Sequence, residues 1–271
     1  MDIVFLHASV PLTKTYSKAA NGVITKSPYP LVWEFTSQTE SCKSLAQLEL
    51  LLLENAKRGH CVLKGSIARP LVQESRAGST DTNSTTDWLV LDLDGLPDTI
   101  EITTPSGQTK TMPLTIDLFL DEMGLSDTSY VVQWSASYGV ENQKLRAHIF
   151  MLLDKPYAAP LIKQWLVQKN HEVPLLNASM HLTKTGNAIS WPLDISACQN
   201  DKLIYIAPPV LKGIKDPMSK QPRIQLVKKK HDLVVFDRTI NTSAKNRELN
   251  HKRIAELRDV AGLPIKKIKY K

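Results

Sequence analysis

Two aspartates, Asp92 and Asp94, stand one residue apart in the apolar stretch "TTDWLVLDLDGLPD" (85–98). An ionised carboxylate beside a buried strand is unfavourable unless it is hydrated, paired or bound to a cation. Because side chains alternate along a strand, both aspartates point to one face, and Leu89, Leu91 and Leu93 point to the other. We expect the pair at the end of this strand, where Gly95 lets the chain turn away. A metal site is one explanation for the pair, and a strand end or turn cap is the commoner one.

The segment "SYVVQWSASYGVENQKLRAHIFMLLD" (129–154) predicts an antiparallel hairpin with one apolar and one polar face. Gln133, Ser135 and Ser137 share the polar face of the first strand, and Arg146 and His148 share that of the second. A lone histidine on a strand usually has a structural role. An arginine beside a histidine, opposite hydroxyl groups, has the donors that hold a phosphate.

A third carboxylate, Asp194, follows an apolar run in "ISWPLDISACQNDKLIYIAPP" (189–209). We expect it on a short hydrophobic strand, where by itself it would be an ordinary strand-end aspartate. Arg76 is the remaining candidate. It belongs to the loop "QESRAGSTDTNSTTD" (73–87) just before the D-x-D strand, where a solvated loop arginine fits the sequence as well as a functional one.

Helices and strands alternate unevenly around these residues. Strands are predicted over "VWEF" (32–35), "HCVLKG" (60–65) and "DKLIYIAPP" (201–209). Helices are predicted over "SLAQLELLLLENAKRG" (44–59), with Ser44 as N-cap and Gly59 as its end, and over "PLTIDLFLDEMGL" (113–125) and "APLIKQWLVQKNHE" (159–172). Together with the hairpin, this order favours a mixed α/β or α+β sheet over a doubly wound parallel one.

Composition is that of a globular protein, with 42% hydrophobic and 23% charged residues in 271. The N-terminus does not resemble a signal peptide, and the longest apolar run, "LAQLELLLLENA" (45–56), is amphipathic and too short to cross a bilayer. The 3 cysteines have no C-x-x-C spacing, which fits a reducing cytoplasm and argues against a zinc ribbon or a disulfide framework. We therefore expect a cytoplasmic protein without a membrane partner.

Positive charge is concentrated in the last part of the chain. Residues 211–271 hold 17 Lys/Arg and 6 Asp/Glu, whereas residues 1–210 hold 17 and 21, and the whole chain is +7. This asymmetry indicates a polyanionic partner, most simply nucleic acid, or else only solubilising tails at "VKKKHD" (227–232) and "IKKIKYK" (265–271). No strand pattern is evident after residue 210, and "SAKNRELNHKRIAELRDVAGL" (243–263) predicts a surface helix or linker.

Taken in order, the D-x-D pair, the strand histidine and the later acid resemble the archaeo-eukaryotic primase superfamily, especially the primase-polymerases of phages and plasmids. The resemblance runs from about residue 64 to residue 209. It rests on "ESRAG" (74–78) ahead of "WLVLDLDG" (88–95), on "SASYGVENQKLRAHIF" (135–150), and on "PLDISACQNDKLIYIAPP" (192–209). The set in this order is more specific than any one motif.

The resemblance implies an α+β catalytic domain over residues 1–210. Its N-terminal α/β portion would cover about 1–85, and an RRM-like mixed or antiparallel sheet flanked by helices would cover about 86–210. Residues 211–271 would form a basic, partly helical extension or linker. In many relatives a helicase follows, but this chain has no G-x-x-x-x-G-K-[ST] phosphate loop, so a helicase would be a separate protein or another part of a longer polypeptide.

The activity implied is template-directed nucleotidyl transfer on single-stranded DNA, by a primase, a DNA polymerase or both, in the cytoplasm of the host if the chain is phage-encoded. Asp92, Asp94 and Asp194 would hold two Mg²⁺ or Mn²⁺ ions, which in such sites stabilise both the attacking and the leaving oxygen. His148 would contact the triphosphate of an incoming NTP or dNTP, and Arg76 could reach a template or nucleotide phosphate from its loop. Many members have a serine two residues before this histidine; here that position is Arg146, so either Ser135 or Ser137 takes the serine's role or Arg146 contacts the phosphate instead.

Three other functions fit parts of the pattern. A haloacid-dehalogenase-like phosphatase also uses D-x-D-G, with Asp92 as the nucleophile, but its motif normally opens the domain and no G-D-x-x-x-D follows here. A glycosyltransferase-type D-x-D leaves the Arg/His hairpin and the basic segment unexplained. A non-catalytic module that binds single-stranded DNA in replication would ignore divalent cations.

Overall fold

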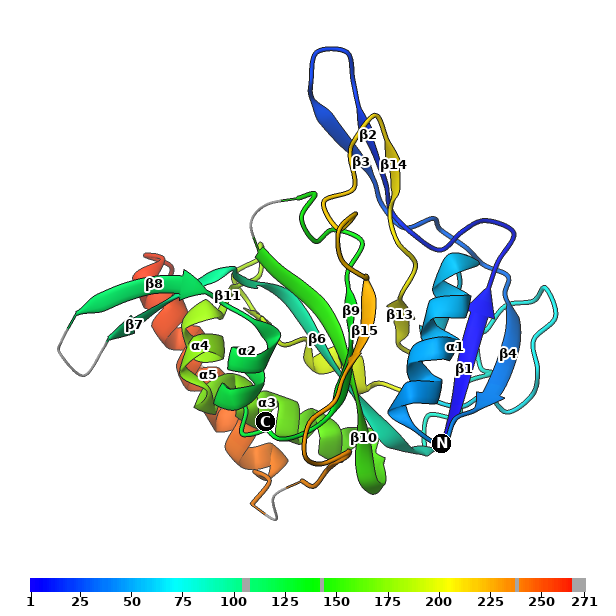
Figure 1. Ribbon diagram of the computed structural model, residues 1–271. Coiled ribbons are helices and arrows are strands. Elements are labelled where there is room, and N and C mark those ends of the chain that lie inside the picture. Colours follow the sequence, from blue (N-terminus) through cyan, green and yellow to red (C-terminus); the bar gives the residue numbers. More distant parts are fainter. Residues whose placement is uncertain (104–107, 142–143, 237–238, 265–271) are drawn as a thin grey trace.

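The computed structural model describes residues 1–103, 108–141, 144–236 and 239–264 (Figure 1). In these residues the chain is a mixed α+β protein with five α-helices and several sheets in which antiparallel pairing dominates, as the sequence predicts. The helices are α1 (Leu45–Lys57), α2 (Ile116–Glu122), α3 (Ala159–Glu172), α4 (Pro174–Ser179) and α5 (Ser243–Val260), and a short 3₁₀ helix covers Ile195–Cys198.

The central sheet is built around one long strand, β10 (Lys144–Ala158), and positions the candidate residues. Along one edge it pairs with β6 (Thr85–Pro97), and along the other it pairs first with β9 (Tyr130–Trp134) and then with β16 (Leu233–Val234). The sheet ends at β15 (Ile224–Val227), which pairs with β9. The predicted hairpin of β9 and β10 is therefore confirmed.

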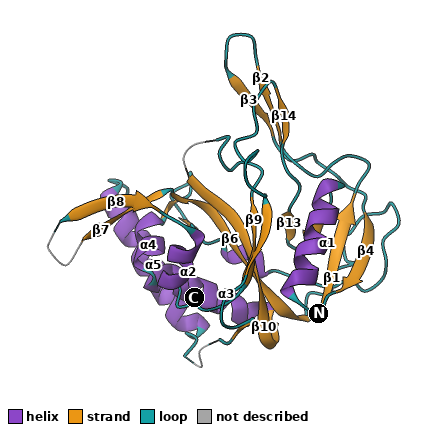
Figure 2. Cartoon of the chain, in the orientation of Figure 1, coloured by secondary structure: helices purple, strands orange, loops and turns teal. Residues whose placement is uncertain are grey.

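Each face of the central sheet packs on a separate hydrophobic core. On β6 the three leucines that alternate with the aspartates, Leu89, Leu91 and Leu93, are buried against α2, α3 and α4. The other face of β6 carries Trp88 and Val90, which pack against α1 and the small sheet. Figure 2 shows the helices α2 to α5 gathered on the first side and α1 on the second. The aspartates thus lie on the same face of β6 as Trp88 and Val90. This face is apolar at the start of the strand and carries the carboxylates further along.

A four-stranded sheet next to α1 forms the outer layer of that second core, in the order β13-β5-β1-β4. Its strands are β1 (Asp2–His7), β4 (Thr36–Ser41), β5 (Cys61–Leu63) and β13 (Leu203–Tyr205). Helix α1 begins where predicted, because the Ser44 side chain accepts a hydrogen bond from the Gln47 backbone N–H, and it ends before Gly59, whose φ is +78°.

Three smaller sheets complete the fold. The first contains β2 (Thr15–Lys18), β3 (Ile24–Ser27) and β14 (Val210–Lys212) and stands out as a separate arm in Figure 1. The others are the hairpins of β7 (Thr99–Thr103) with β8 (Thr109–Pro113), and of β11 (His181–Leu182) with β12 (Ile189–Ser190).

Two expectations about strands are wrong. "VWEF" (32–35) is not a strand; β4 begins after it at Thr36, because Val32 and Trp33 have no strand partner and only Phe35 makes an isolated bridge. Strands also do not stop at residue 210, since β15 and β16 complete the central sheet. The helix predicted over 243–263 is confirmed as α5, and the basic end "IKKIKYK" (265–271) lies outside the described residues.

Candidate functional site

The register of β6 and β10 places the two polar pairs directly opposite each other. His148 faces Asp92 and Arg146 faces Asp94 across the strands. The aspartates do not end the strand as expected: β6 continues to Pro97. Gly95, with φ at +89°, is the extra residue of a β-bulge between two successive pairs, and such a bulge changes where the neighbouring side chains point.

Asp194 approaches β6 from its other edge. Its backbone N–H donates to the Asp92 carbonyl at 2.9 Å, and the Asp94 N–H donates to the Pro192 carbonyl at 3.0 Å. Asp194 is not on the short strand that the sequence predicts. It caps the 3₁₀ helix instead, with its Oδ1 accepting from the Ser196 N–H at 2.7 Å. Although Asp194 is not on a strand, these main-chain hydrogen bonds to β6 hold its carboxylate beside those of Asp92 and Asp94.

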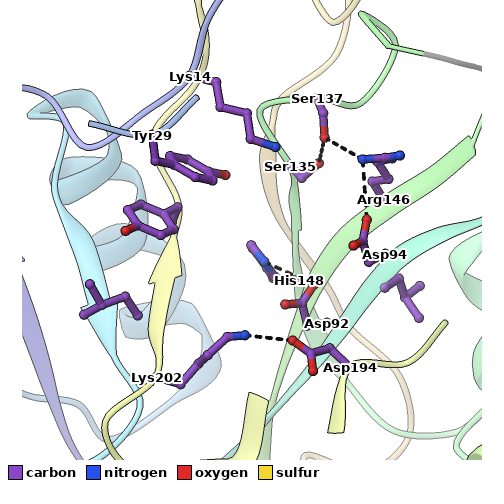
Figure 3. Close-up of a pocket in the computed structure, with 13 residues that line it drawn as sticks. Lys14, Tyr29, Asp92, Asp94, Ser135, Ser137, Arg146, His148, Asp194 and Lys202 are labelled. Carbon is purple, nitrogen blue, oxygen red and sulfur yellow. Dashed lines mark hydrogen bonds and ion pairs between the residues drawn. The ribbon is translucent and has the colours of Figure 1, made fainter. Parts of the chain in front are cut away.

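These segments enclose a pocket of about 260 Å³ (Figure 3). Seven of the eight residues singled out in the sequence line it, and they come from three separate parts of the chain. They are Asp92, Asp94, Ser135, Ser137, Arg146, His148 and Asp194. The eighth, Arg76, lines a different pocket beside Trp33, and its guanidinium donates to the Asp201 carbonyl at 2.9 Å. The expected placement of Arg76 at the same site is therefore not found.

Asp92 is the best-shielded acid of the pocket, with 19% of its side chain exposed. Its Oδ1 lies 3.4 Å from His148 Nε2, while His148 Nδ1 lies 2.5 Å from the Gln133 amide oxygen. Burial would raise the pKa of Asp92, but the nearby His148, Lys202 and Lys14 outweigh it and the pKa is lowered. Asp92 is thus held as a carboxylate, and Gln133 fixes the ring that faces it.

Arg146 connects the second aspartate to the rim of the pocket. Its Nη1 lies 3.4 Å from Asp94 Oδ1 and 3.5 Å from Glu141 Oε2, and it donates to the Ser137 hydroxyl at 3.5 Å. These contacts are long, and the buried Nε of Arg146 has no partner among the described residues. Asp94 is 68% exposed, so its oxygens are open to solvent. The guanidinium is thus anchored by long contacts, and its donors are not all satisfied.

Besides Leu93 and Leu203, the pocket is lined by two lysines and two tyrosines that the sequence did not single out: Lys14, Tyr29, Lys202 and Tyr205. Lys202 is the closest to the acids, because its Nζ lies 2.7 Å from Asp194 Oδ2. The ring of Tyr29 stands opposite Asp92 and His148 in Figure 3, and it stacks on the ring of Tyr205 with the centroids 3.8 Å apart. Burial, followed by the charge of Asp92, raises the pKa of Tyr29, so its hydroxyl stays protonated.

Only one of these four could have been found by pattern. Lys202 lies eight residues after Asp194, in the polar turn before an apolar strand, and a search for a cation near the third acid would have reached it. Lys14 and Tyr29 stand at the two ends of the β2–β3 arm, far from every motif in the sequence. Nothing in their local spacing connects them with the D-x-D pair.

The donor set fits a hard divalent cation. Carboxylate oxygens of Asp92 and Asp94 share one strand face, Asp194 is hydrogen-bonded beside them, and the depressed pKa of Asp92 supplies a permanent negative charge. Each acid, however, has a basic neighbour: His148, Arg146 and Lys202 respectively. In the described part of the chain no three His, Cys, Asp or Glu side chains form a ready metal-binding group. A cation at Asp194 would therefore have to compete with the Lys202 ammonium.

Comparison with known proteins identifies no relative. No family model, no curated protein and no solved structure matches the chain. Among the described residues, no helix has the length and apolar character needed to cross a membrane. The three cysteines are free and buried.

Proposed function

We propose that the chain is a template-directed nucleotidyltransferase of the archaeo-eukaryotic primase type, a primase or DNA polymerase acting on single-stranded DNA. The observation that carries the proposal is the convergence of three motifs on one pocket. Asp92 and Asp94, then Arg146 and His148, then Asp194 are separated by about 50 residues each in the sequence, yet all line the same cavity. A D-x-D pair alone would not support this reading.

The acids are proposed to hold Mg²⁺ or Mn²⁺. Asp92 and Asp94 supply oxygen ligands from the strand, and Asp194 supplies a third when it parts from Lys202. Divalent ions at such a site lower the barrier by stabilising negative charge on the attacking and leaving oxygens of a phosphoryl transfer. Because three carboxylates lie together, cation binding also relieves their mutual repulsion.

The basic residues are proposed to bind the triphosphate of an NTP or dNTP. His148 lies next to Asp92 with a ring fixed by Gln133, and Arg146 has a buried Nε without a partner. Lys14 and Lys202 add two ammonium groups on the opposite wall. This placement lets the phosphates sit between the acids and the cations, where charge-assisted hydrogen bonds are strongest.

Ser135 and Ser137 are proposed to contact the nucleotide through their hydroxyl groups, from the side of the pocket that carries Arg146. Their Oγ atoms lie 3.0 Å apart, and Ser137 also accepts from Arg146. The serine that many family members carry beside the histidine would thus be supplied from the turn after β9. Arg76 is no longer proposed as a nucleotide contact, since it lines another pocket.

The partners that follow are a single-stranded DNA template and nucleoside triphosphates, with a helicase as a separate protein or another part of a longer polypeptide. An RRM-like description of the central sheet and a cytoplasmic location belong to the same proposal. The antiparallel sheet with helices gathered on one side agrees with it at the level of fold class.

The test is incorporation of labelled nucleotides on unprimed and primed single-stranded DNA with Mg²⁺ or Mn²⁺. We expect activity in the wild type and a loss of at least about a hundredfold in Asp92→Ala, since a two-metal site cannot form. Asp121→Ala is the matched control, because this exposed aspartate of α2 lies outside the pocket. Wild-type rates in Asp92→Ala would refute the proposed site.

Two other outcomes point to the alternatives. Hydrolysis of p-nitrophenyl phosphate that needs Asp92 but no DNA would indicate a phosphatase with Asp92 as the nucleophile. DNA binding without any incorporation, unchanged by either metal, would indicate a non-catalytic DNA-binding module. Either result replaces the polymerase proposal.

A further inference from the structure

The arm formed by β2, β3 and β14 begins and ends at the candidate site. Lys14 immediately precedes β2 and Tyr29 follows β3, and both line the pocket that contains Asp92. The third strand, β14, pairs with β2 in parallel and places Lys212 opposite Ser17. Figure 1 shows the arm extending away from the body of the molecule, so it is a continuation of the pocket wall into solvent.

The arm carries only positive charge. Residues 13–27 and 210–215 together contain five lysines and no aspartate or glutamate. These are Lys14, Lys18, Lys26, Lys212 and Lys215. Lys14, Lys18 and, by its pairing opposite Tyr16, Lys26 share one face of the sheet, so three of the five form a row that leads away from the pocket.

Most of this charge is not neutralised within the molecule. Lys26 pairs with Glu141 at 2.7 Å. By contrast, no carboxylate in the described residues lies within ion-pair distance of Lys18, Lys212 or Lys215, which are all exposed. All four residues of β3 are exposed as well, so this strand contributes nothing to a core. A projecting sheet without a core of its own, with unpaired lysines, is well suited to an anionic partner.

We propose that this arm binds the sugar-phosphate backbone of a single-stranded nucleic acid and guides it to the pocket. The inference depends on the proposed function only for the strand's role as template; the interaction itself follows from charge and position. Lysine ammonium groups act as point contacts to phosphate and need no base sequence, which suits a strand that must slide. Lys26 and Arg146 both pair with Glu141, and Lys14 lies close enough to both cations to feel their charge, so the base of the arm adjoins the proposed phosphate contacts of the pocket.

An anionic lipid surface is the competing partner. The tip of the arm exposes Val23 (55%) and Ile24 (46%), and apolar residues beside lysines are also typical of membrane-surface segments. The connection to the pocket favours the strand, because a lipid-bound arm would turn the pocket toward the membrane. The experiment below includes both partners.

The test measures binding of a fluorescein-labelled 20-residue oligothymidylate by anisotropy, in EDTA and without nucleotide. The variant Lys18→Ala/Lys212→Ala/Lys215→Ala removes three exposed lysines that do not line the pocket. The control Lys245→Ala/Arg247→Ala/Lys252→Ala removes the same charge from the exposed side of α5. Urea unfolding of all three proteins shows whether the fold is kept.

We expect the arm variant to bind at least about tenfold more weakly at 50 mM salt. The slope of log K against log [salt] should become shallower by about 2, because each lost phosphate contact contributes about 0.7 on single strands. The α5 variant should change the slope by less than half as much. Equal slopes for the arm variant and the wild type, or a larger change in the α5 variant, would overturn the proposal. So would arm-dependent pelleting with phosphatidylserine vesicles together with unchanged DNA binding.

This result is independent of catalysis. If Asp92→Ala keeps full incorporation while the arm variant loses the strand, the proposed active site fails and the binding surface stands. If incorporation depends on Asp92 and the arm variant binds normally, the binding surface fails and the active site stands.

Discussion

At the scale of single residues, Lys64 is an unusual cation because it lies in the core away from the pocket. It is 1% exposed, and its Nζ donates to the Thr86 hydroxyl at 2.6 Å and the Trp88 carbonyl at 3.0 Å. The ammonium also lies 4.1 Å from the centre of the Trp88 ring. Burial lowers the pKa of Lys64 from 10.5 to about 7, and none of the described carboxylates forms an ion pair with it.

The folded protein should therefore become more stable as the pH rises from about 7. Between this value and about 10.5 the unfolded chain still binds the proton and the folded chain does not, so raising the pH favours folding. Below pH 7 the penalty is largest, about 4 to 5 kcal/mol for the full pKa difference. Lys64→Met should remove most of it and be more stable than the wild type at pH 6.5 by about 2 to 4 kcal/mol.

Urea unfolding at pH 6.5, 7.5 and 8.5 measures this effect. The difference in stability between Lys64→Met and the wild type should shrink by about 1.4 kcal/mol per pH unit between 7.5 and 8.5. Taking the difference between the two proteins cancels the titration of the cysteines. A difference that stays constant with pH would mean that Lys64 has an ordinary pKa in the folded state.

At the scale of elements, the bulge at Gly95 sets the direction of the second aspartate. Gly95 has φ at +89°, and a Cβ there would lie 3.3 Å from the Lys144 side chain. Gly95→Ala should therefore lower the free energy of unfolding by about 1 to 2 kcal/mol and also straighten the pairing of Asp94 with Arg146. We expect nucleotide incorporation to fall by at least about tenfold, with a higher requirement for Mn²⁺.

Gly124→Ala is the matched control for this bulge. Its φ is +74° and an added Cβ would meet no atom within 4 Å, so it should lose similar stability through the backbone alone. Urea unfolding and a Mn²⁺ titration of incorporation on both variants separate the two effects. If both variants lose the same activity, the bulge has no special role in placing Asp94.

The elements that could be predicted from sequence are those with local signals. Helix α3 spans Ala159–Glu172 as its pattern predicts, and α1 has both its N-cap and its terminal glycine in sequence. Strand β15 could not be recognised, because Ile224–Val227 is short, lies among polar and basic residues, and is defined by a partner more than 90 residues away. Lys14 and Tyr29 could not be predicted either, because they are far from the motifs in sequence and line the pocket only through the position of the arm.

The candidate site was predictable where residue type and strand alternation suffice. Alternation placed Asp92, Asp94, Arg146 and His148 on the correct faces, because a period of two holds for any paired strand. Alternation gives no information on where a strand ends, so the continuation of β6 past Gly95 was missed. Asp194 was selected by type, but its role as a 3₁₀-helix cap depends on the turn that Ser196 makes.

At the scale of the whole molecule, the basic C-terminal part of the chain has two different physical roles. Strands β15 and β16 complete the central sheet. The Arg258 side chain of α5 donates to the carbonyls of Gly186 and Pro264, so the helix end is fixed to the body of the molecule. Residues 265–271, which contain four lysines, follow that contact. At least one positive charge of this region, that of Arg258, therefore stabilises the fold instead of being free to bind a partner.

Two truncations separate these roles. A chain ending at residue 222 loses β15, β16 and α5, exposes an edge of β9, and should fail to fold cooperatively. A chain ending at Pro264 keeps every described contact of α5 and should unfold within about 0.5 kcal/mol of the wild type, because none of the described contacts is removed. Circular dichroism during urea unfolding measures both. A cooperative, fully folded 1–222 chain would show that β15 and β16 are dispensable, and that the basic region is an appended segment as its composition alone suggests.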